Sequence, residues 1–313
     1  MTEDFEIKNV WICGVGGVGG YFGGRVAYNI QRFNADELKV FFLARGMHLD
    51  QIKKNGLKLL KEDGEKIYCH PTLASKDIQN FPPPDLCLIC VKSYDLKPLI
   101  NTIQNEVSDS TVIIPLMNGI DIYERIRKIL KKCVVLPSCV YVGSHIEKPG
   151  YVIQTGNPGF FKCGPDPKFP DFNPKPIIDF FEKMNIEMNW QENPYPAIWK
   201  KYLLVASFAL VSAKTNQTLG EIIESEKSKK VLEEIMEEIV AIAEKHGVKL
   251  EDTIIPDTIE FCRDYPEVKP SYARDIEKGK KNEGDLFGGT IIRMGKELGV
   301  PTPRTKSIYN EST

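Results

Sequence analysis

The stretch Ile7-Lys8-Asn9-Val10-Trp11-Ile12-Cys13-Gly14-Val15-Gly16-Gly17-Val18-Gly19 decides the fold of this chain. Its first half is an apolar run typical of a buried strand, and its second half is a G-x-G-x-x-G pattern directly before a helical pattern. In that context Gly14 permits the tight turn, Gly16 lets the backbone approach a pyrophosphate, and Gly19 lets helix and strand pack closely. We therefore assign Gly14, Val15, Gly16, Gly17, Val18 and Gly19 to a dinucleotide site at a helix N-terminus. The alternative is a glycine-rich turn that binds nothing.

The end of the next predicted strand indicates which dinucleotide binds. An NAD site usually has Asp or Glu there, whereas this chain reads Phe42-Leu43-Ala44-Arg45-Gly46. A guanidinium can make two charge-assisted hydrogen bonds to a 2′-phosphate, so Arg45 favours NADPH. The alternative is an ordinary surface arginine, because residues 29–37 lengthen the preceding connection.

The first 190 residues alternate apolar runs with helical patterns, as βαβ units and a largely parallel sheet do. The predicted strands are 7–13, 38–43, 86–91, 111–114 and 133–140, with hairpins around Asp63-Gly64 and Lys148-Pro149-Gly150. Beyond Glu192-Asn193-Pro194 the chain is helical in pattern, over 197–213, 228–246, 254–264, 275–281 and 286–298, the last closed by Gly299. We therefore expect an α/β fold: a Rossmann-type domain over 1–193 and an all-helical domain over 194–313. On the helix 228–246, the glutamates opposite the apolar stripe, Glu238 included, are expected to face solvent.

The helix that opens the second domain is apolar on nearly every side after its first turn, and we expect it to be buried. A lysine entering such a helix is desolvated, which lowers its pKa and makes it a usable proton donor near neutral pH. Lys200 and Lys201 both stand at this place, and the residues alone leave the choice open. Two snorkelling lysines at a helix start are the alternative.

Composition excludes several classes of function. The 313 residues carry a net charge of −2 and a pI near 6.2, so no basic field exists for general nucleic-acid binding. No apolar stretch has the roughly 20 residues that span a bilayer, and the first ten residues lack a secretion signal. Eight scattered cysteines indicate a reducing cytoplasm. Cys87 and Cys90 lie three apart in a predicted strand and so face opposite ways, and the four histidines are isolated, so we expect no metal site.

Several motifs together resemble the ketopantoate reductase (2-dehydropantoate 2-reductase) family, over about residues 8–309. They are the glycine loop, Lys92-Ser93, Met117-Asn118-Gly119, Trp199-Lys200-Lys201, the segment 270–279 (PSYARDIEKG) with Asn282-Glu283, and the tail 295–303 (GKELGVPTP). The resemblance implies a Rossmann domain followed by a helical domain, and NADPH-dependent reduction of a 2-oxo acid on the route to pantothenate and coenzyme A. It also implies a homodimer, the assembly expected of the family.

The resemblance also implies roles for individual residues. Lys201, rather than Lys200, matches the catalytic lysine, and Glu283 matches its partner carboxylate. Ser271 matches a substrate-binding hydroxyl, Asn118 an asparagine near both nicotinamide and substrate, and Lys92 a lysine near the cofactor. Taken without the resemblance, Glu283 is an ordinary surface glutamate, Ser271 a helix cap and Asn118-Gly119 a turn.

Two departures from the family pattern concern the substrate. Val205 and Ala209 stand where the family commonly has asparagines that contact substrate, and Ser207 or Ser212 are the hydroxyls that could compensate. Gly284 and Gly288 stand where larger residues are common, which predicts a roomier site. Two alternatives to a ketopantoate reductase therefore stay open: a related reductase of another 2-oxo acid, and an NADPH-binding regulatory protein without turnover.

Overall fold

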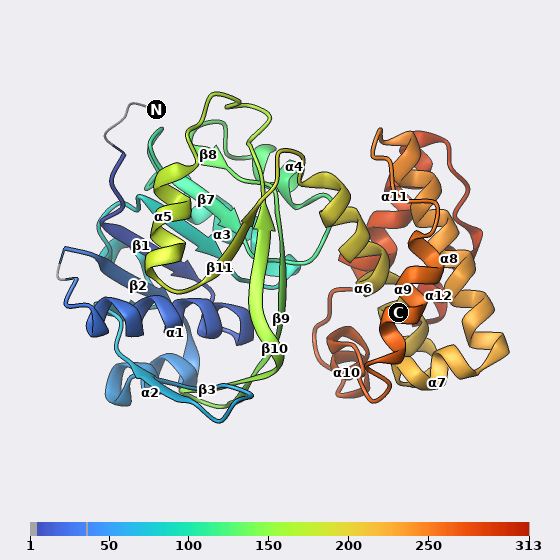
Figure 1. Cartoon of the computed structure of the whole chain (residues 1–313), viewed down its shortest axis with the longest axis horizontal. Coiled ribbons are helices and arrows are strands. Elements are labelled where there is room, and N and C mark those ends of the chain that lie inside the picture. The colour runs from blue at the N-terminus through green and yellow to red at the C-terminus, as the bar shows by residue number, and fades with distance from the viewer. Residues whose placement is uncertain (1–4, 36, 313) are drawn as a thin grey trace. The chain divides into compact units, whose positions relative to one another are not determined.

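The computed structural model describes residues 5–35 and 37–312, and its internal contacts divide the chain into two compact units (Figure 1). The first unit comprises residues up to Met117 together with Ile122–Pro194, and it is an α/β structure. The second comprises Asn118–Asp121 and the chain from Tyr195 onward, and it is helical. The predicted fold class, a Rossmann-type domain followed by a helical domain, is confirmed.

The first unit contains a six-stranded sheet in the order β5-β2-β1-β6-β7-β8. Every neighbouring pair in it is parallel, so the carboxyl ends of all six strands lie at one edge. The strands are β1 (Asn9–Cys13), β2 (Lys39–Leu43), β5 (Leu73–Ser75), β6 (Leu86–Ile89), β7 (Val112–Pro115) and β8 (Val134–Val135). This edge is where ligands bind in open α/β sheets.

A second, mixed sheet completes this unit; its two hairpins were predicted from the sequence, but their joining in one sheet was not. It has the order β11-β10-β3-β4, with β9 paired to β10. Its strands are β3 (Leu57–Leu60), β4 (Lys66–Cys69), β9 (Ser138–Lys148), β10 (Tyr151–Cys163) and β11 (Glu187–Trp190). Both predicted hairpins are confirmed as the antiparallel pairs β3·β4 and β9·β10. The strand predicted over 133–140 is wrong as a single element, because the chain leaves β8 at Leu136-Pro137 and starts β9 in the other sheet.

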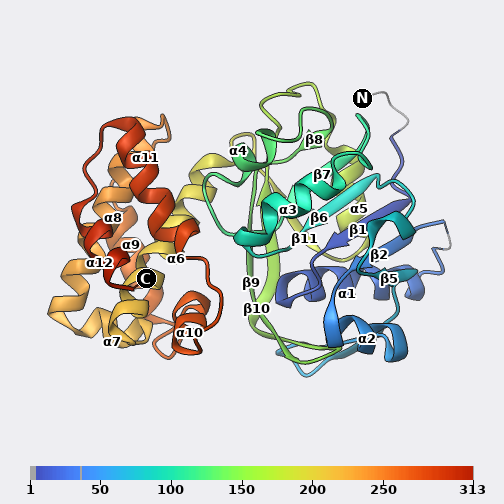
Figure 2. The same cartoon turned by 180° about the vertical axis from the view of Figure 1, so that it is seen from behind.

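Helices cover both faces of the parallel sheet. They are α1 (Gly17–Arg32), α2 (Gly46–Asn55), α3 (Ser93–Ile103), α4 (Ile122–Arg127) and α5 (Lys175–Lys183), with a 3₁₀ turn η1 (Ile78–Asn80). Helix α1 packs against strands of both sheets, so one continuous core joins them. Figures 1 and 2 show α3 on the face of the parallel sheet opposite to α1 and α5.

The second unit is built around α6 (Tyr195–Thr215), which contacts four other α-helices and is buried along most of its length, as predicted. Its other helices are α7 (Leu219–Glu224), α8 (Glu226–Lys245), α9 (Ile254–Arg263), α10 (Ser271–Glu277), α11 (Thr290–Leu298) and α12 (Pro303–Ser312). The helix predicted over 275–281 is wrong in its bounds, because α10 begins directly after Pro270. The helix predicted over 286–298 starts as a π-helical turn, η2 (Asp285–Gly289), and ends as predicted at Gly299 in the left-handed conformation.

Glu238 on α8 corrects the prediction that all the glutamates of this helix face solvent. Its side chain is buried and accepts hydrogen bonds from the main-chain N–H groups of Arg304 at 2.6 Å and Thr305 at 2.9 Å. These are first-turn donors of α12, which have no partner within their own helix. Glu238 therefore caps α12 from a distant part of the chain.

Among the helices of residues 5–35 and 37–312, none combines the length and the apolar character that a membrane span requires.

Candidate active site

The glycine loop joins β1 to α1 at the carboxyl edge of the parallel sheet. Gly14 has φ +95°, and its N–H donates to the main-chain oxygen of Leu43 at 3.1 Å. A Cβ on Gly14 would lie 2.9 Å from the oxygen of Cys90, and one on Gly19 only 2.0 Å from the oxygen of Gly14. A Cβ on Gly16, by contrast, would meet nothing within 4 Å. Gly14 and Gly19 are thus required by packing, whereas Gly16 leaves the backbone open to a ligand.

The first turn of α1 has the chemistry of an anion site. Gly16 is its N-cap residue, and no side chain caps the helix there. The N–H groups of a first helical turn lack partners within the helix and carry partial positive charge. The cradle formed by Gly16 and this turn therefore fits a pyrophosphate.

Arg45 and Lys92 lie at the same edge of the sheet as the glycine loop. Arg45 follows β2 as the N-cap residue of α2, and Lys92 follows β6 as the N-cap residue of α3. Since β2 and β6 flank β1, the topology brings the three segments together. The Arg45 side chain is 81% exposed and its Nη2 lies 2.7 Å from Oδ2 of Asp95. An exposed ion pair of this kind is worth less than about 1 kcal/mol, so a phosphate can replace the carboxylate.

His48, one turn after Arg45, is a residue that the sequence analysis missed. Its Nδ1 accepts a hydrogen bond from the N–H of Gly150 at 3.0 Å. Its Nε2 is buried, without a hydrogen-bond partner among the described residues. Burial lowers the pKa of His48, and the backbone of Val15, in the glycine loop, acts in the opposite direction. The imidazole therefore lies where α2, the glycine loop and the β9–β10 turn meet, and it is held in its neutral form.

The structure distinguishes the two candidate lysines of α6. Lys200 is exposed, and its Nζ lies 3.9 Å from Oε2 of Glu251 on the surface. Lys201 is half-buried, at the point where the helix enters its apolar part. The helix therefore turns Lys201, and not Lys200, toward its partly buried side.

Tyr202, the next residue, ties α6 to the segment that carries Glu283. Its hydroxyl lies 2.8 Å from the main-chain oxygens of both Leu286 and Phe287. Both carbonyls belong to a π-helical turn, and such turns are frequent at functional sites. Glu283 comes directly before this turn and is buried, with 6% exposure, so it is not the surface glutamate that its charged sequence context indicated.

The remaining predicted residues also belong to the helical unit. Asn118 follows β7 and is half-buried, in the segment Asn118–Asp121 that clusters with this unit. Asp121 at the end of that segment accepts from the Thr290 hydroxyl at 3.4 Å and lies 4.0 Å from Arg293. Ser271 is the exposed first residue of α10, and the N-cap position belongs to Pro270, so the helix-cap interpretation of Ser271 is not supported.

Two expectations about the substrate environment are wrong. Ser207 and Ser212 do not offer their hydroxyls, because each donates at 2.6 Å to a main-chain oxygen, of Leu203 and Gln217 respectively. The space beside Gly284 and Gly288 is not open either. A Cβ on Gly288 would lie 2.6 Å from the ring of Tyr309, and one on Gly284 would lie 2.9 Å from the hydroxyl of Tyr272. Aromatic side chains fill the volume that the glycines leave.

The face of α6 that carries Lys201 is apolar beyond the lysine. Val205, one turn further, is half-buried, and Ala209, another turn on, is fully buried.

Among the described residues no group of three or more His, Cys, Asp or Glu side chains could hold a metal ion.

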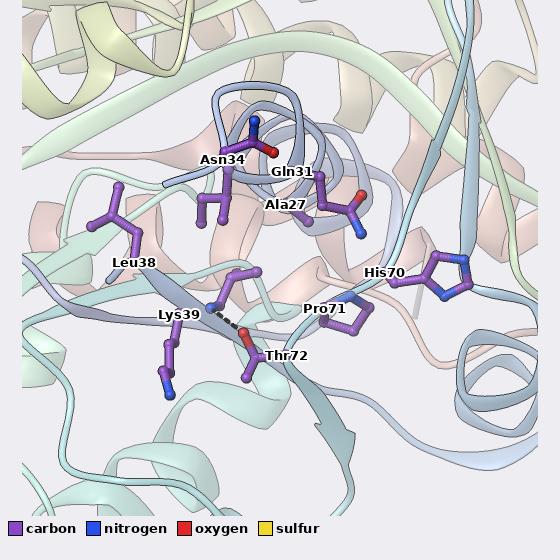
Figure 3. A pocket seen from close by; sticks show the side chains of 10 residues that line it. Ala27, Gln31, Asn34, Leu38, Lys39, His70, Pro71 and Thr72 are labelled. Carbon is purple, nitrogen blue, oxygen red and sulfur yellow. Dashed lines mark hydrogen bonds between the residues drawn. The ribbon is translucent and has the colours of Figure 1, made fainter. Parts of the chain in front are cut away.

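A cavity elsewhere in the first unit is unrelated to these groups. It has a volume of about 300 Å³ and is lined by side chains of α1, the start of β2 and the segment after β4, among them Gln31, Asn34, Lys39, His70 and Thr72 (Figure 3). The main-chain N–H of Val40 donates to the Thr72 hydroxyl at 3.1 Å. Because it adjoins the amino end of β2, this cavity lies at the sheet edge opposite to the glycine loop.

Comparison with known proteins places this geometry in context. Residues 10–168 match the model of the family described as "Ketopantoate reductase PanE/ApbA", and residues 194–312 match the model of its C-terminal part. The "Uncharacterized oxidoreductase YkpB" of Bacillus subtilis is 26% identical over 299 residues, 95% of each chain. A 2-dehydropantoate 2-reductase of Streptococcus pyogenes is 25% identical over 308 residues, 96% of this chain and 95% of its own. The crystal structure of a PanE/ApbA family ketopantoate reductase from Ralstonia eutropha matches with TM-score 0.87 and 27% identity over 97% of both chains.

Proposed function

The chain belongs to the ketopantoate reductase family of oxidoreductases, and from this premise we propose that it reduces 2-dehydropantoate (ketopantoate) to pantoate with NADPH. This reaction is a step toward pantothenate and coenzyme A, and we place it in the cytoplasm. The observation that carries the proposal is the position of Lys201: a half-buried amine whose neighbour Tyr202 is bonded to the segment beginning at Glu283.

The residues at the carboxyl edge of the parallel sheet fit NADPH. Gly16 leaves room for the pyrophosphate to approach the backbone, and the first turn of α1 supplies N–H donors to it. The exposed guanidinium of Arg45 fits a 2′-phosphate, because it can exchange its surface carboxylate for two phosphate oxygens. Lys92, at the N-cap of α3, is assigned to the same cofactor.

The chemical step needs a hydride and a proton. NADPH, when bound, supplies the hydride with its electron pair to the carbonyl carbon of the 2-oxo acid. The Lys201 ammonium donates a hydrogen bond to the carbonyl oxygen, stabilises the negative charge that develops there, and gives that oxygen its proton. Glu283 holds the amine in its charged form and in orientation, and Asn118 and Ser271 bind the substrate. The product is the 2-hydroxy acid, with NADP⁺ and neutral Lys201, which regains a proton from water.

A second candidate, reduction of another 2-oxo acid, is favoured by the face of α6 next to Lys201. Val205 and Ala209 offer no hydrogen bond to a hydroxylated substrate, and the nearby serines are bonded to their own main chain. A substrate with a hydrocarbon side chain needs no hydrogen bond from this face of α6, so its binding would not be weakened.

The test is NADPH oxidation by the purified protein with ketopantoate and with 2-oxo acids of increasing apolar side chain, each repeated with NADH. The proposal predicts the highest kcat/KM for ketopantoate with NADPH. A higher kcat/KM for 2-oxoisovalerate or a bulkier acid would establish the second candidate. Tight NADPH binding without turnover of any acid would instead identify a regulatory protein.

A further inference from the structure

Tyr272, the second residue of α10, has a buried hydroxyl that nothing in the fold satisfies. The side chain is 1% exposed, and its hydroxyl has no hydrogen-bond partner among the described residues. Buried polar groups nearly always have a partner, and leaving one without costs free energy of folding. The hydroxyl therefore does not serve stability, since phenylalanine would fill the same space without that cost.

The hydroxyl lies beside the residue that follows Glu283. A Cβ on Gly284 would come within 2.9 Å of the Tyr272 oxygen and 3.2 Å of Oδ1 of Asn282. The Asn282 oxygen accepts the N–H of Gly284 at 3.1 Å and makes no hydrogen bond with the phenol. The phenol thus occupies the volume that a side chain at position 284 would fill, and it brings a donor to the start of the π-helical turn.

An aromatic cluster formed by Tyr272, Phe287 and Tyr202 joins this hydroxyl to the helix of Lys201. The ring of Phe287 packs edge-on against Tyr272, with centroids 5.5 Å apart, and lies 6.4 Å from the ring of Tyr202. Tyr202 directly follows Lys201 in α6. Three segments that are distant in sequence, and that carry Lys201, Glu283 and Tyr272, therefore pack together in the helical unit.

The protonation state of the Tyr272 phenol indicates which kind of ligand atom it can bind. Burial raises the pKa of Tyr272 to about 12, so at neutral pH the group is protonated and can donate one hydrogen bond. Hydrogen bonds from an O–H group to an anionic oxygen are the strong kind. A 2-oxo acid carries one such anion, its carboxylate, next to the carbonyl on which Lys201 acts.

We propose that Tyr272 is a further substrate-binding residue, whose hydroxyl donates a hydrogen bond to the carboxylate of the 2-oxo acid. This inference rests on the proposed function. It explains why Gly284 lacks a side chain: the phenol needs that space to approach the substrate.

The first test is Tyr272→Phe, which removes one oxygen and keeps the ring. KM for the 2-oxo acid is expected to rise about 10- to 100-fold, the range for a lost hydrogen bond to a charged group, while the Kd of NADPH stays unchanged. With the methyl ester of the same acid, which lacks the anionic carboxylate, wild type and variant should have equal kcat/KM. An unchanged KM for the acid, or an equal loss on the ester, would overturn the proposal.

The second test is thermal stability, with Tyr202→Phe as the matched control. Tyr202→Phe removes a hydroxyl bonded to two main-chain oxygens and should lower Tm, whereas Tyr272→Phe should keep or raise it. A Tm loss in Tyr272→Phe equal to that of the control would make the hydroxyl structural and refute the inference. If the wild type turns over no 2-oxo acid at all, the proposed function itself falls, and this result is seen before any variant is made.

Discussion

The hydroxyl of Tyr202 lies 2.8 Å from the main-chain oxygen of Leu286, although the two residues are 84 positions apart. This contact fixes the start of α6 against the π-helical turn, and it thereby links the segment of Lys201 to that of Glu283. Under the proposed function Lys201 is the catalytic amine, which needs a fixed position. The hydrogen bonds of its neighbour Tyr202 fix the backbone that carries it.

The glycine loop predicts opposite results for two similar substitutions. Gly16→Ala should fold with unchanged Tm, because the added methyl meets no protein atom within 4 Å, yet it should weaken NADPH binding about tenfold or more by occupying the pyrophosphate's approach. Gly19→Ala should lower Tm, because its methyl would overlap the oxygen of Gly14. Fluorescence titration with NADPH and thermal unfolding measure the two effects. Undiminished NADPH affinity in a folded Gly16→Ala variant would contradict the site.

From the position of Arg45 we predict that the protein prefers NADPH to NADH. Arg45→Ala should raise the Kd of NADPH about 10- to 100-fold, since a bidentate hydrogen bond to the 2′-phosphate is lost, and leave that of NADH within about twofold. Lys53→Ala, a basic residue in the last turn of the same helix, is the matched control. Equal losses for NADPH and NADH would mean that Arg45 does not bind the 2′-phosphate.

From the lowered pKa of His48 we predict that the folded protein loses stability in mild acid. Burial holds its pKa in the folded protein below the ordinary 6.5, so the unfolded chain takes up the proton first as pH falls. Stability should therefore decrease from about pH 6.5 downward, until the folded protein is protonated as well. His48→Asn keeps an acceptor for the Gly150 N–H and should flatten this part of the Tm profile against pH, whereas His145→Asn, at the surface, should not. A profile that is identical in wild type and His48→Asn would refute the assignment.

From the contacts of Asp166 we predict a large loss of stability when its charge is removed. Its fully buried carboxylate pairs with Arg127 and accepts hydrogen bonds at 2.7 Å from both the Tyr123 hydroxyl and the Val135 N–H. Asp166→Asn leaves the Arg127 charge uncompensated and should cost about 3–5 kcal/mol in the free energy of unfolding. Asp179→Asn breaks an exposed ion pair with Lys175 and should cost under about 1 kcal/mol. Urea denaturation compares the two; similar midpoints would contradict the role of Asp166.

The sequence predicts the fold where the pattern is local. The strand, glycine loop and helix around Gly14 are contiguous, and α6 is apolar enough to be recognised as buried. The joining of the two predicted hairpins in one sheet was missed, because β10 pairs with strands from two distant parts of the chain, a relation that no short pattern encodes. The strand predicted over 133–140 fails at Pro137, where the chain passes from one sheet to the other.

The chemistry of the candidate site was less predictable, because it depends on contacts between segments. Glu238 lies in a row of acidic residues, and only the start of α12, 66 positions later, gives it a buried role. Tyr272 lies in the motif from which only Ser271 was predicted as a site residue. Its hydroxyl can lie where it does only because Gly284 has no side chain. The two glycines seemed to leave space, which Tyr309 and Tyr272 fill.

The proposed role of Lys201 is tested by comparing the turnover of Lys201→Ala with that of Lys200→Ala. Both variants are assayed for NADPH oxidation with the preferred 2-oxo acid, and both are titrated with NADPH in the absence of substrate. We expect Lys201→Ala to lower kcat by about 10²- to 10⁴-fold and to keep its affinity for NADPH. Lys200→Ala, at the surface, should behave as wild type. Full turnover by Lys201→Ala would show that the proton comes from elsewhere.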